Sequence, residues 1–302
     1  MRMSLFDRFL HFDRIVEHRF PPLGELINVN GHKMHVLCAG PRDDVPVVLI
    51  HGASGNIRDW SLSVFKDLAE HHGTIAIDRP GFGFSDRLPD YGWQLIDQID
   101  HMRRGLRVLA VHEYILVGHS YGGSLAMRWA LDHPDEVQGL CLISAPVMDW
   151  GGGGIGAHYH VGGRPVMGDV LARKARFLGG GSALPRAIAN VFDPEPIPVG
   201  YLEEGGAELA LRPTTFRTNS VMMLRLYEQI REQAKRNSDL AVRTEIIHGT
   251  ADTIVPHFIH AEPLAEMHRE ARLTLLDGVG HMPHHSHPEA ITSAITRLAD
   301  QA

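Results

Sequence analysis

Apolar residues fall into short continuous runs, separated by longer stretches in which apolar and polar positions alternate with helical spacing. Continuous runs, typical of strands buried on both faces of a parallel sheet, lie at 45–52, 73–80, 113–120 and 137–144. Helical periodicity is found between them at 57–70, 92–112 and 121–133. This alternation predicts a mostly parallel sheet covered by helices on both faces.

The two ends of the pattern add further strands. Residues 24–40 predict a β-hairpin, because Asn30-Gly31 supplies the positive φ angles that its tight turn needs. Late in the chain, strands are expected at 243–250 and 271–278, and each is followed by a stretch with helical spacing.

Between 147 and 240 the alternation of strands and helices breaks. This stretch is rich in glycine and proline and holds helical segments, the clearest at 219–236. We interpret it as a helical cap inserted after the sixth strand, not as a second independent domain. The predicted division is an N-terminal segment at 1–23, an α/β core at 24–146 and 241–302, and the cap at 147–240.

In the N-terminal segment five apolar residues recur at roughly helical spacing: Phe6, Phe9, Leu10, Ile15 and Val16. Charged residues interrupt every apolar run, so we predict a short amphipathic helix packed on its own domain and not a signal peptide. No run approaches the ~18 apolar residues that span a membrane. We expect a cytoplasmic protein without stable membrane insertion. Contact with a membrane surface, or with a second subunit in a homo-oligomer, is a less favoured role for this helix.

Composition narrows the partners of the protein. Its 302 residues suffice for a sizeable core, and 44% hydrophobic and 22% charged residues are typical of a globular protein. A net charge of −7 offers no basic surface for nucleic acid. Cys38 and Cys141 lie in predicted strands without neighbouring metal-type ligands, which predicts buried thiols and not a disulfide bond.

Histidines crowd into one late stretch, "GHMPHHSHPE", which holds His281, His284, His285 and His287. Such a cluster raises the question of a metal site. A loop broken by prolines offers little of the preorganised geometry that a metal site requires. We therefore expect solvated loop histidines, no metal site and no organic cofactor.

The most informative stretch is "ILVGHSYGGS" at 115–124. Ser120 stands between Gly118 and Gly122, where a predicted strand meets a predicted helix, which is the context of the G-x-S-x-G nucleophile elbow. Glycines at both outer positions leave room for a turn that lifts the hydroxyl above the strand ends. A free serine is a poor nucleophile and needs a general base.

An acid and a histidine follow in the chain order expected of such a site. Asp252 follows the strand at 243–250 and His281 follows the strand at 271–278, so both lie at carboxyl ends of strands, where open α/β sheets place their sites. We expect Asp252, not Asp277, to orient the imidazole. Each residue alone could be an ordinary loop residue, but together with Ser120 they predict a catalytic triad.

A hydrolytic site of this kind also needs an oxyanion hole and a pocket. The backbone donors should be the amides of Tyr121, just after the nucleophile, and of Ala53, in the loop after the strand at 45–52. His51, in the same loop, is interpreted as a hydrogen-bonded structural residue. Apolar cap residues are candidates to line an acyl pocket or to pack the cap on the core: Trp150, Met222 and Met223. The glycine run at 151–154 is predicted to be mobile and to gate access.

With these residues assembled, the chain resembles the α/β-hydrolase superfamily, and within it the esterases, perhydrolases and carbon–carbon hydrolases that carry a helical cap. The resemblance rests on "HGASGNIRDW", "DRPGFGFSD", "GHSYGG" and the loops that carry Asp252 and His281. It implies the α/β-hydrolase fold and a mainly structural role for "DRPGFGFSD". Relatives that dehalogenate or open epoxides have aspartate at the elbow, so Ser120 disfavours those chemistries.

The sequence favours a serine carboxylesterase that cleaves small or medium acyl esters through an acyl-enzyme intermediate. A thioesterase, lactonase, cofactor-free perhydrolase or carbon–carbon bond hydrolase would use the same triad, because the pocket and not the fold decides the substrate. The short oxyanion loop "HGASG" disfavours the carbon–carbon hydrolases. A ligand receptor that has lost catalysis is the most distant alternative, since all three triad residues are present.

Overall fold

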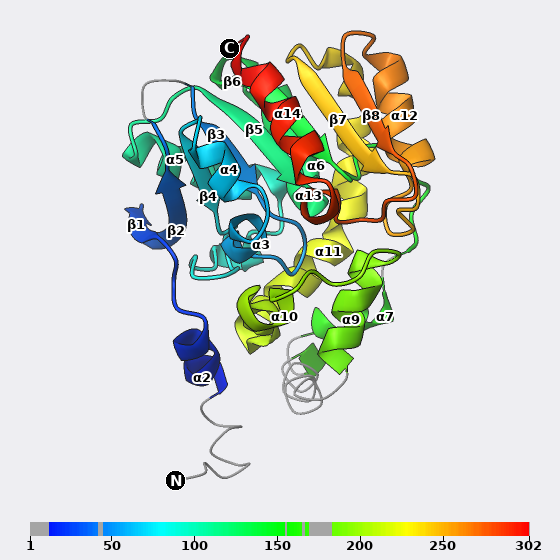
Figure 1. The fold of residues 1–302 in the computed structure, drawn as a ribbon. Coiled ribbons are helices and arrows are strands. Elements are labelled where there is room, and N and C mark those ends of the chain that lie inside the picture. Colours follow the sequence, from blue (N-terminus) through cyan, green and yellow to red (C-terminus); the bar gives the residue numbers. More distant parts are fainter. Residues whose placement is uncertain (1–11, 42–44, 155, 165–166, 169–182, 302) are drawn as a thin grey trace.

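An eight-stranded sheet runs through the centre of the molecule, with helices on both of its faces (Figure 1). This computed structural model describes residues 12–41, 45–154, 156–164, 167–168 and 183–301. The strands are Glu25–Val29 (β1), His32–Ala39 (β2), Val47–Ile50 (β3), Thr74–Ile77 (β4), Tyr114–His119 (β5), Val137–Ile143 (β6), Thr244–Gly249 (β7) and Arg272–Leu276 (β8). Their order across the sheet is β1-β2-β4-β3-β5-β6-β7-β8.

The sheet is mostly parallel, as predicted. Strands β1 and β2 form the antiparallel hairpin, β2 pairs antiparallel with β4, and all later pairs are parallel. Asn30 and Gly31 turn the hairpin with φ angles of 52° and 86°. Every residue of β3, β4 and β5 is buried, because helices cover both faces of these apolar strands.

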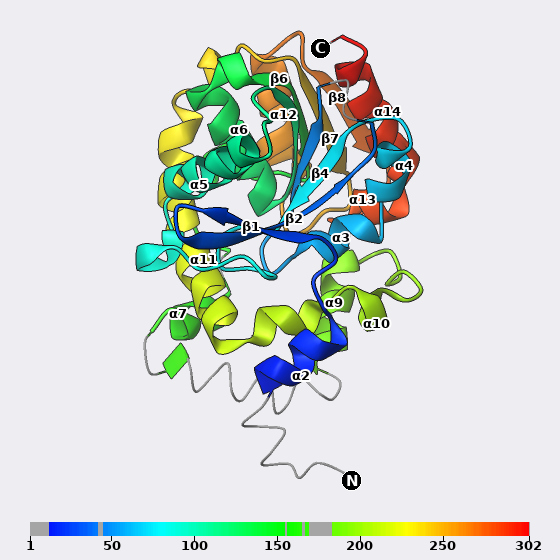
Figure 2. The same cartoon turned by 90° about the vertical axis from the view of Figure 1, so that its left-hand side faces the viewer.

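The helices of the core divide between the two faces of the sheet (Figure 2). On one face lie Leu95–Val108 (α5), Tyr121–Asp132 (α6) and His257–Met267 (α12), whose apolar side chains join one cluster. On the other face lie Ile57–Ser61 (α3), Phe65–Ala69 (α4) and Pro288–Ala299 (α14), which share a second cluster. The short helix Pro283–Ser286 (α13) precedes α14, and short 3-10 helices occur at Pro89–Gly92 (η1) and Pro134–Glu136 (η2).

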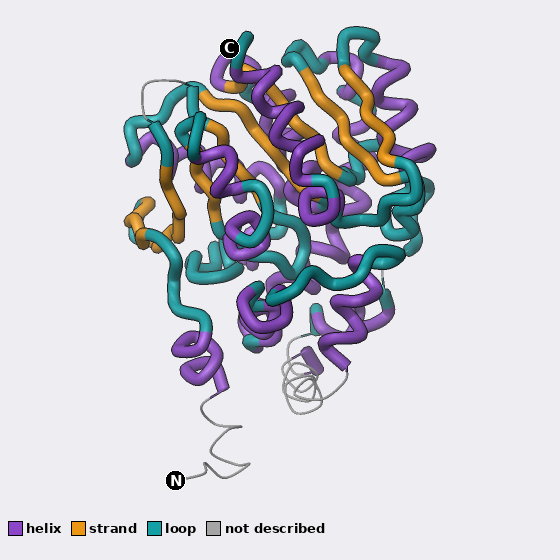
Figure 3. Tube along the Cα trace, viewed as in Figure 1, coloured by secondary structure: helices purple, strands orange, loops and turns teal. Residues whose placement is uncertain are grey.

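The segment between β6 and β7 contains helices and loops and no strand among its described residues (Figure 3). Its helices are Ala157–Gly162 (α7), Ala183–Phe192 (α9), Tyr201–Glu204 (α10), Ala207–Leu211 (η3), Pro213–Ala234 (α11) and Asn237–Asp239 (η4). Helices α7, α9 and α10 lie at one end of the sheet, beyond the carboxyl ends of the parallel strands (Figure 1). Helix α11 extends from this end along the core, where Met222, Leu226 and Ile230 join the cluster of α5 and α6 (Figure 2). This arrangement confirms a helical insertion after the sixth strand, and its exact domain boundaries stay predictions.

The described part of the N-terminal segment packs on the insertion. Helix Phe12–Arg19 (α2) contributes Val16 to a small apolar cluster with Phe20 and Leu209 of η3. Glu17 accepts a hydrogen bond from Arg212 Nη1 at 2.8 Å. Three residues of the predicted helix lie outside the described residues: Phe6, Phe9 and Leu10. Within the described ranges, no helix combines the length and apolar character required to cross a membrane.

One of the two cysteines departs from prediction. Cys141 in the central strand β6 is buried, and burial raises the pKa of its thiol. Cys38 in β2 is exposed, so the prediction of a buried thiol was wrong there. Its place in the sheet differs from that of Cys141, because Cys38 lies in β2 beyond Val36, where the pairing with β1 ends, and not in a central strand.

Candidate active site

Ser120 occupies a sharp turn between β5 and α6. Its φ and ψ angles are 53° and −122°, a conformation that non-glycine residues rarely adopt. Two close approaches require glycine around it: a Cβ on Gly118 would lie 2.3 Å from the Gly122 oxygen, and a Cβ on Gly122 would lie 2.2 Å from the Ile50 oxygen. The local sequence therefore permits the strained turn that holds the hydroxyl above the sheet.

The three residues of the predicted triad lie in hydrogen-bonding contact. His281 Nε2 is 3.0 Å from Ser120 Oγ, and His281 Nδ1 is 2.8 Å from Asp252 Oδ2. The residues follow β5, β7 and β8, so the carboxyl edge of the sheet brings them together. Asp277 lies elsewhere and accepts a hydrogen bond from Thr250 Oγ1 at 3.2 Å.

The surroundings of Asp252 keep its carboxyl ionised. The side chain is buried, and Oδ1 accepts the amides of Ile254 and Val255, both at 2.9 Å. Burial acts to raise the pKa of Asp252, but the attraction of His281 and hydrogen bonds from His248, His281 and Val255 outweigh it and hold the pKa well below its ordinary value. An ionised carboxylate only accepts hydrogen bonds, so the hydrogen lies on His281 Nδ1 and leaves Nε2 free to take the Ser120 proton.

Two backbone amides beside Ser120 lack the usual partners. Tyr121 is the first residue of α6, so its amide has no acceptor within the helix. The amide of Ala53 has no acceptor among the described residues. Both residues line the same cavity as Ser120. Unpaired amides next to a nucleophile are what an oxyanion hole requires, and this role of Ala53 and Tyr121 stays a prediction.

A buried arginine fixes the loop that carries Ala53. Arg79, from the "DRPGFGFSD" stretch, donates from Nε to the His51 oxygen at 3.0 Å and from Nη2 to the Gly52 oxygen at 2.9 Å. The Arg79 amide donates to His51 Nε2 at 3.0 Å. Burial, and then the charge of Arg79, lowers the pKa of His51 to about 4. His51 is therefore a neutral, hydrogen-bonded structural residue.

A cavity of about 320 Å³ opens at Ser120. Two of the predicted cap residues, Trp150 and Met223, lie on its wall, as do three residues of the glycine run 151–154. Met222 does not line the cavity. It is fully buried in the core, with Sδ 3.8 Å from Arg79 Nη1, so the prediction that it lines the pocket was wrong. Neighbours in a helix point about 100° apart, which turns one methionine to the cavity and the other inward. Mobility of the glycine run stays a prediction.

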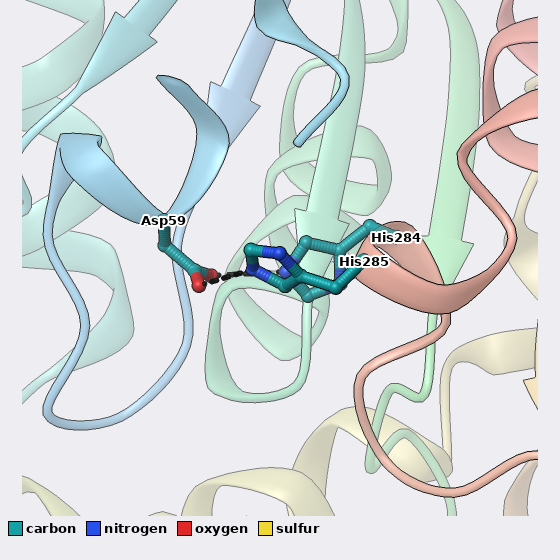
Figure 4. Close-up of side chains that lie close together, drawn as sticks. All are labelled: Asp59, His284 and His285. Atoms are coloured by element: carbon teal, nitrogen blue, oxygen red, sulfur yellow. Dashed lines mark hydrogen bonds and ion pairs between the residues drawn. The ribbon is translucent and has the colours of Figure 1, made fainter. Parts of the chain in front are cut away.

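The late histidines are not solvated, contrary to expectation. His284 and His285 lie in α13, and their side chains are 0% and 2% exposed. Their Nε2 atoms lie 3.0 and 2.9 Å from the two carboxylate oxygens of Asp59 in α3 (Figure 4). Tyr201 OH donates to the same carboxylate at 3.0 Å. A proline-broken loop is buried here because a carboxylate from a distant helix satisfies its polar groups.

The same three side chains have the composition of a metal site. One ligand atom each from Asp59, His284 and His285 lies within 4.8 Å of the others. Hydrogen bonds account for these contacts, since each histidine meets a separate carboxylate oxygen. Burial acts to raise the pKa of Asp59, but His284 and then His285 hold it well below its ordinary value. We call this hydrogen-bonded cluster the anchor, and the absence of a metal from it stays a prediction.

This anchor touches the loop of the predicted general base. The rings of His284 and His119 lie 4.4 Å apart, centre to centre. His119 Nε2 is 2.9 Å from the backbone oxygen of His281. Through His119, the anchor therefore supports the segment that carries the His281 imidazole.

Three buried polar residues near the site were missed in the sequence. Asp59 and His248 contact α13 and Asp252, respectively, and His260 lines the cavity. The only signal available was a polar residue inside an otherwise apolar helix or strand. Such a residue is expected to be buried and hydrogen-bonded, but the sequence does not show which residue is its hydrogen-bond partner.

Comparison with known proteins agrees with this architecture. A model of the alpha/beta hydrolase family matches residues 47–294. An uncharacterized protein of Mycobacterium tuberculosis is 28% identical over 307 residues, which cover 93% of this chain and 82% of that protein. The 2-hydroxymuconate semialdehyde hydrolase of Pseudomonas sp. strain CF600 is 31% identical over 127 residues, which cover 41% of this chain and 44% of that enzyme.

The fold also matches solved structures. A meta-cleavage product hydrolase from Pseudomonas fluorescens IP01 superimposes with a TM-score of 0.70 at 22% identity, covering 92% of this chain and 97% of that one. At this identity the likeness concerns the fold. The family match spans the sheet from β3 to α14, including the elbow and both late loops. The chain therefore belongs to the alpha/beta hydrolase family.

Proposed function

We propose that this protein is a serine carboxylesterase that cleaves small or medium acyl esters. One observation carries the proposal: Ser120 Oγ, His281 and Asp252 form a continuous hydrogen-bonded chain, with distances of 3.0 and 2.8 Å, at the wall of a cavity. Such a chain activates a hydroxyl that is otherwise a poor nucleophile.

In this mechanism Ser120 Oγ attacks the ester carbonyl carbon while its proton passes to His281 Nε2. The carbonyl π electrons move to oxygen, where the amides of Ala53 and Tyr121 stabilise the charge. As the carbonyl re-forms, the alkoxide leaves and takes the proton from His281. Water then repeats the sequence on the acyl-enzyme and releases the acid, with Asp252 holding the imidazole in place throughout.

The cavity supports an uncharged acyl group of modest size. Its volume of about 320 Å³ lies near the lower end of the range for ligand pockets. Apolar side chains such as Met223, Leu226 and Ile259 line it, and its wall holds no lysine or arginine among the described residues. A buried anionic substrate would therefore lack a charged partner.

A second candidate is cleavage of a carbon–carbon bond by the same three residues. The local match to 2-hydroxymuconate semialdehyde hydrolase and the fold of the meta-cleavage product hydrolase favour it. A panel of p-nitrophenyl esters, acyl-CoA thioesters and vinylogous diketones would separate the two candidates. We expect p-nitrophenyl esters of short and medium chains to give the highest kcat/KM.

The test of the mechanism is Ser120→Ala, with Ser238→Ala as the matched control because Ser238 is exposed. Loss of the nucleophile should lower kcat on the order of 10⁶-fold, since triad residues act as a unit. The control should retain the wild-type rate. Ester hydrolysis at an unchanged rate in correctly folded Ser120→Ala would overturn the proposal.

A further inference from the structure

A histidine in the cavity wall has one ring nitrogen without a partner. His260 in α12 is only 3% exposed and lines the same cavity as Ser120. Its Nδ1 accepts the backbone N–H of Met148 at 3.1 Å. Its Nε2 has no hydrogen-bond partner among the described residues, and protein atoms do not close it off.

The protonation of this ring follows from its contacts. Because Nδ1 accepts a backbone N–H, it carries no hydrogen itself. Burial, and then the neighbouring His248, lowers the pKa of His260 to about 4, so the ring is neutral near pH 7. A neutral imidazole without hydrogen on Nδ1 carries it on Nε2. The ring of this cavity-lining residue therefore carries an N–H donor at Nε2.

Other polar side chains of the wall are already engaged or exposed. Trp150 Nε1 donates to the Gly153 oxygen at 3.1 Å, and Tyr121 OH accepts from Gln98 Nε2 at 3.0 Å. Thr253 is exposed. Within the described wall, His260 is thus a buried donor kept open in apolar surroundings, where an unmade hydrogen bond is costly.

We propose that His260 Nε2–H binds a second oxygen in the acyl part of the substrate, a carbonyl or ether oxygen separate from the carbonyl that Ser120 attacks. The inference rests on the proposed esterase function, in which this cavity takes the acyl group. The oxyanion amides hold the scissile carbonyl, so the donor is available to another acceptor. A carboxylate would be buried against one neutral donor, and a hydroxyl would bring a hydrogen without an acceptor. An oxo-acyl or ether-substituted acyl group fits a single donor best.

The experiment compares matched esters that differ in one oxygen. The pairs are p-nitrophenyl pentanoate with 4-oxopentanoate, and hexanoate with 5-oxohexanoate. His260→Phe keeps a ring but removes the donor, and His260→Gln returns a donor near the position of Nε2. Both variants remove the imidazole acceptor of the Met148 amide, so their difference isolates the Nε2 donor.

We expect wild type to prefer an oxo ester, and the ratio of kcat/KM within that pair to fall about tenfold in His260→Phe. His260→Gln should restore part of the ratio. A purely structural histidine would change both members of a pair equally. The same ratio in all three proteins would overturn the inference.

A binding measurement separates this inference from the proposed function. Ser120→Ala cannot form the acyl-enzyme, so the intact esters can be titrated by calorimetry into Ser120→Ala and into the Ser120→Ala/His260→Phe double variant. If wild type hydrolyses neither ester, the proposed function fails, and the Kd ratio then decides the inference. A ratio that favours the oxo ester only when His260 is present supports it. Equal ratios, or no binding of the oxo esters, overturn it.

Discussion

Replacing Asp59 with asparagine should destabilise the folded protein by about 3–5 kcal/mol, because it removes a buried charged acceptor of several hydrogen bonds. The carboxylate accepts three hydrogen bonds, from His284 Nε2 at 3.0 Å, His285 Nε2 at 2.9 Å and Tyr201 OH at 3.0 Å. Asparagine has only one acceptor oxygen in place of two, and its NH₂ group would point toward one of the three donors and could not accept its hydrogen. Each lost bond to a charged acceptor is worth about 1.5–3 kcal/mol, and little water can compensate because Asp59 is buried.

The assay is equilibrium unfolding in urea, followed by circular dichroism and tryptophan fluorescence. Asp67→Asn is the matched control, because Asp67 is exposed in α4 and should lose less than about 0.5 kcal/mol. Coincident transitions by the two probes would justify a two-state fit. An Asp59→Asn protein as stable as the control would refute the assignment of a buried hydrogen-bonded anchor.

The same proteins distinguish hydrogen bonds from a bound metal at this cluster. The hydrogen-bonded assignment predicts no stoichiometric metal by elemental analysis of the purified protein. It also predicts the same urea midpoint and the same esterase rate before and after EDTA treatment. One equivalent of metal, removed by EDTA together with stability or activity, would contradict it.

Three further predictions follow from the site and its surroundings. Asp252→Asn should lower kcat about 10⁴-fold, as loss of the orienting acid does in a serine protease, while Asp277→Asn should leave kcat unchanged; equal losses would contradict the triad. Alanine at the two central glycines of 151–154 should alter kcat/KM more for long acyl esters than for acetate, and an equal effect would make the run a connector. Glu136→Gln should destabilise the protein at pH 7 and progressively less below pH 4.5. A hydrogen bond from Arg103, only partly opposed by burial, lowers the folded-state pKa of Glu136 from 4.5 to about 2, so its contribution is present above pH 4.5 and fades as the pH falls toward 2. Urea unfolding that gives the same destabilisation by Glu136→Gln at every pH in this range would contradict the expectation.

The arrangement of the site could be predicted where the signals are local. The elbow at Ser120 is specified by five consecutive residues, and Asp252 and His281 each follow an apolar strand. Because parallel strands end at one edge of the sheet, the position of each residue just after a strand was enough to predict that the three lie near one another. The hairpin turn was equally local, since Asn30-Gly31 supplies its own backbone conformation.

Features that depend on distant partners could not be predicted. The burial of His284 depends on Asp59, which lies 225 residues earlier in the chain. The exposure of Cys38 depends on where a neighbouring strand stops pairing. Met222 and Met223 are adjacent and chemically equal, so only the packing of α11 on the core decides which one faces the cavity.

The most direct test of the proposed mechanism is detection of the acyl-enzyme itself. Wild type is mixed with a p-nitrophenyl ester, quenched in acid within milliseconds and analysed by intact-protein and peptide mass spectrometry. We expect one acyl group on the peptide that contains Ser120, and none in Ser120→Ala. Hydrolysis without an adduct, or an adduct on another residue, would contradict it.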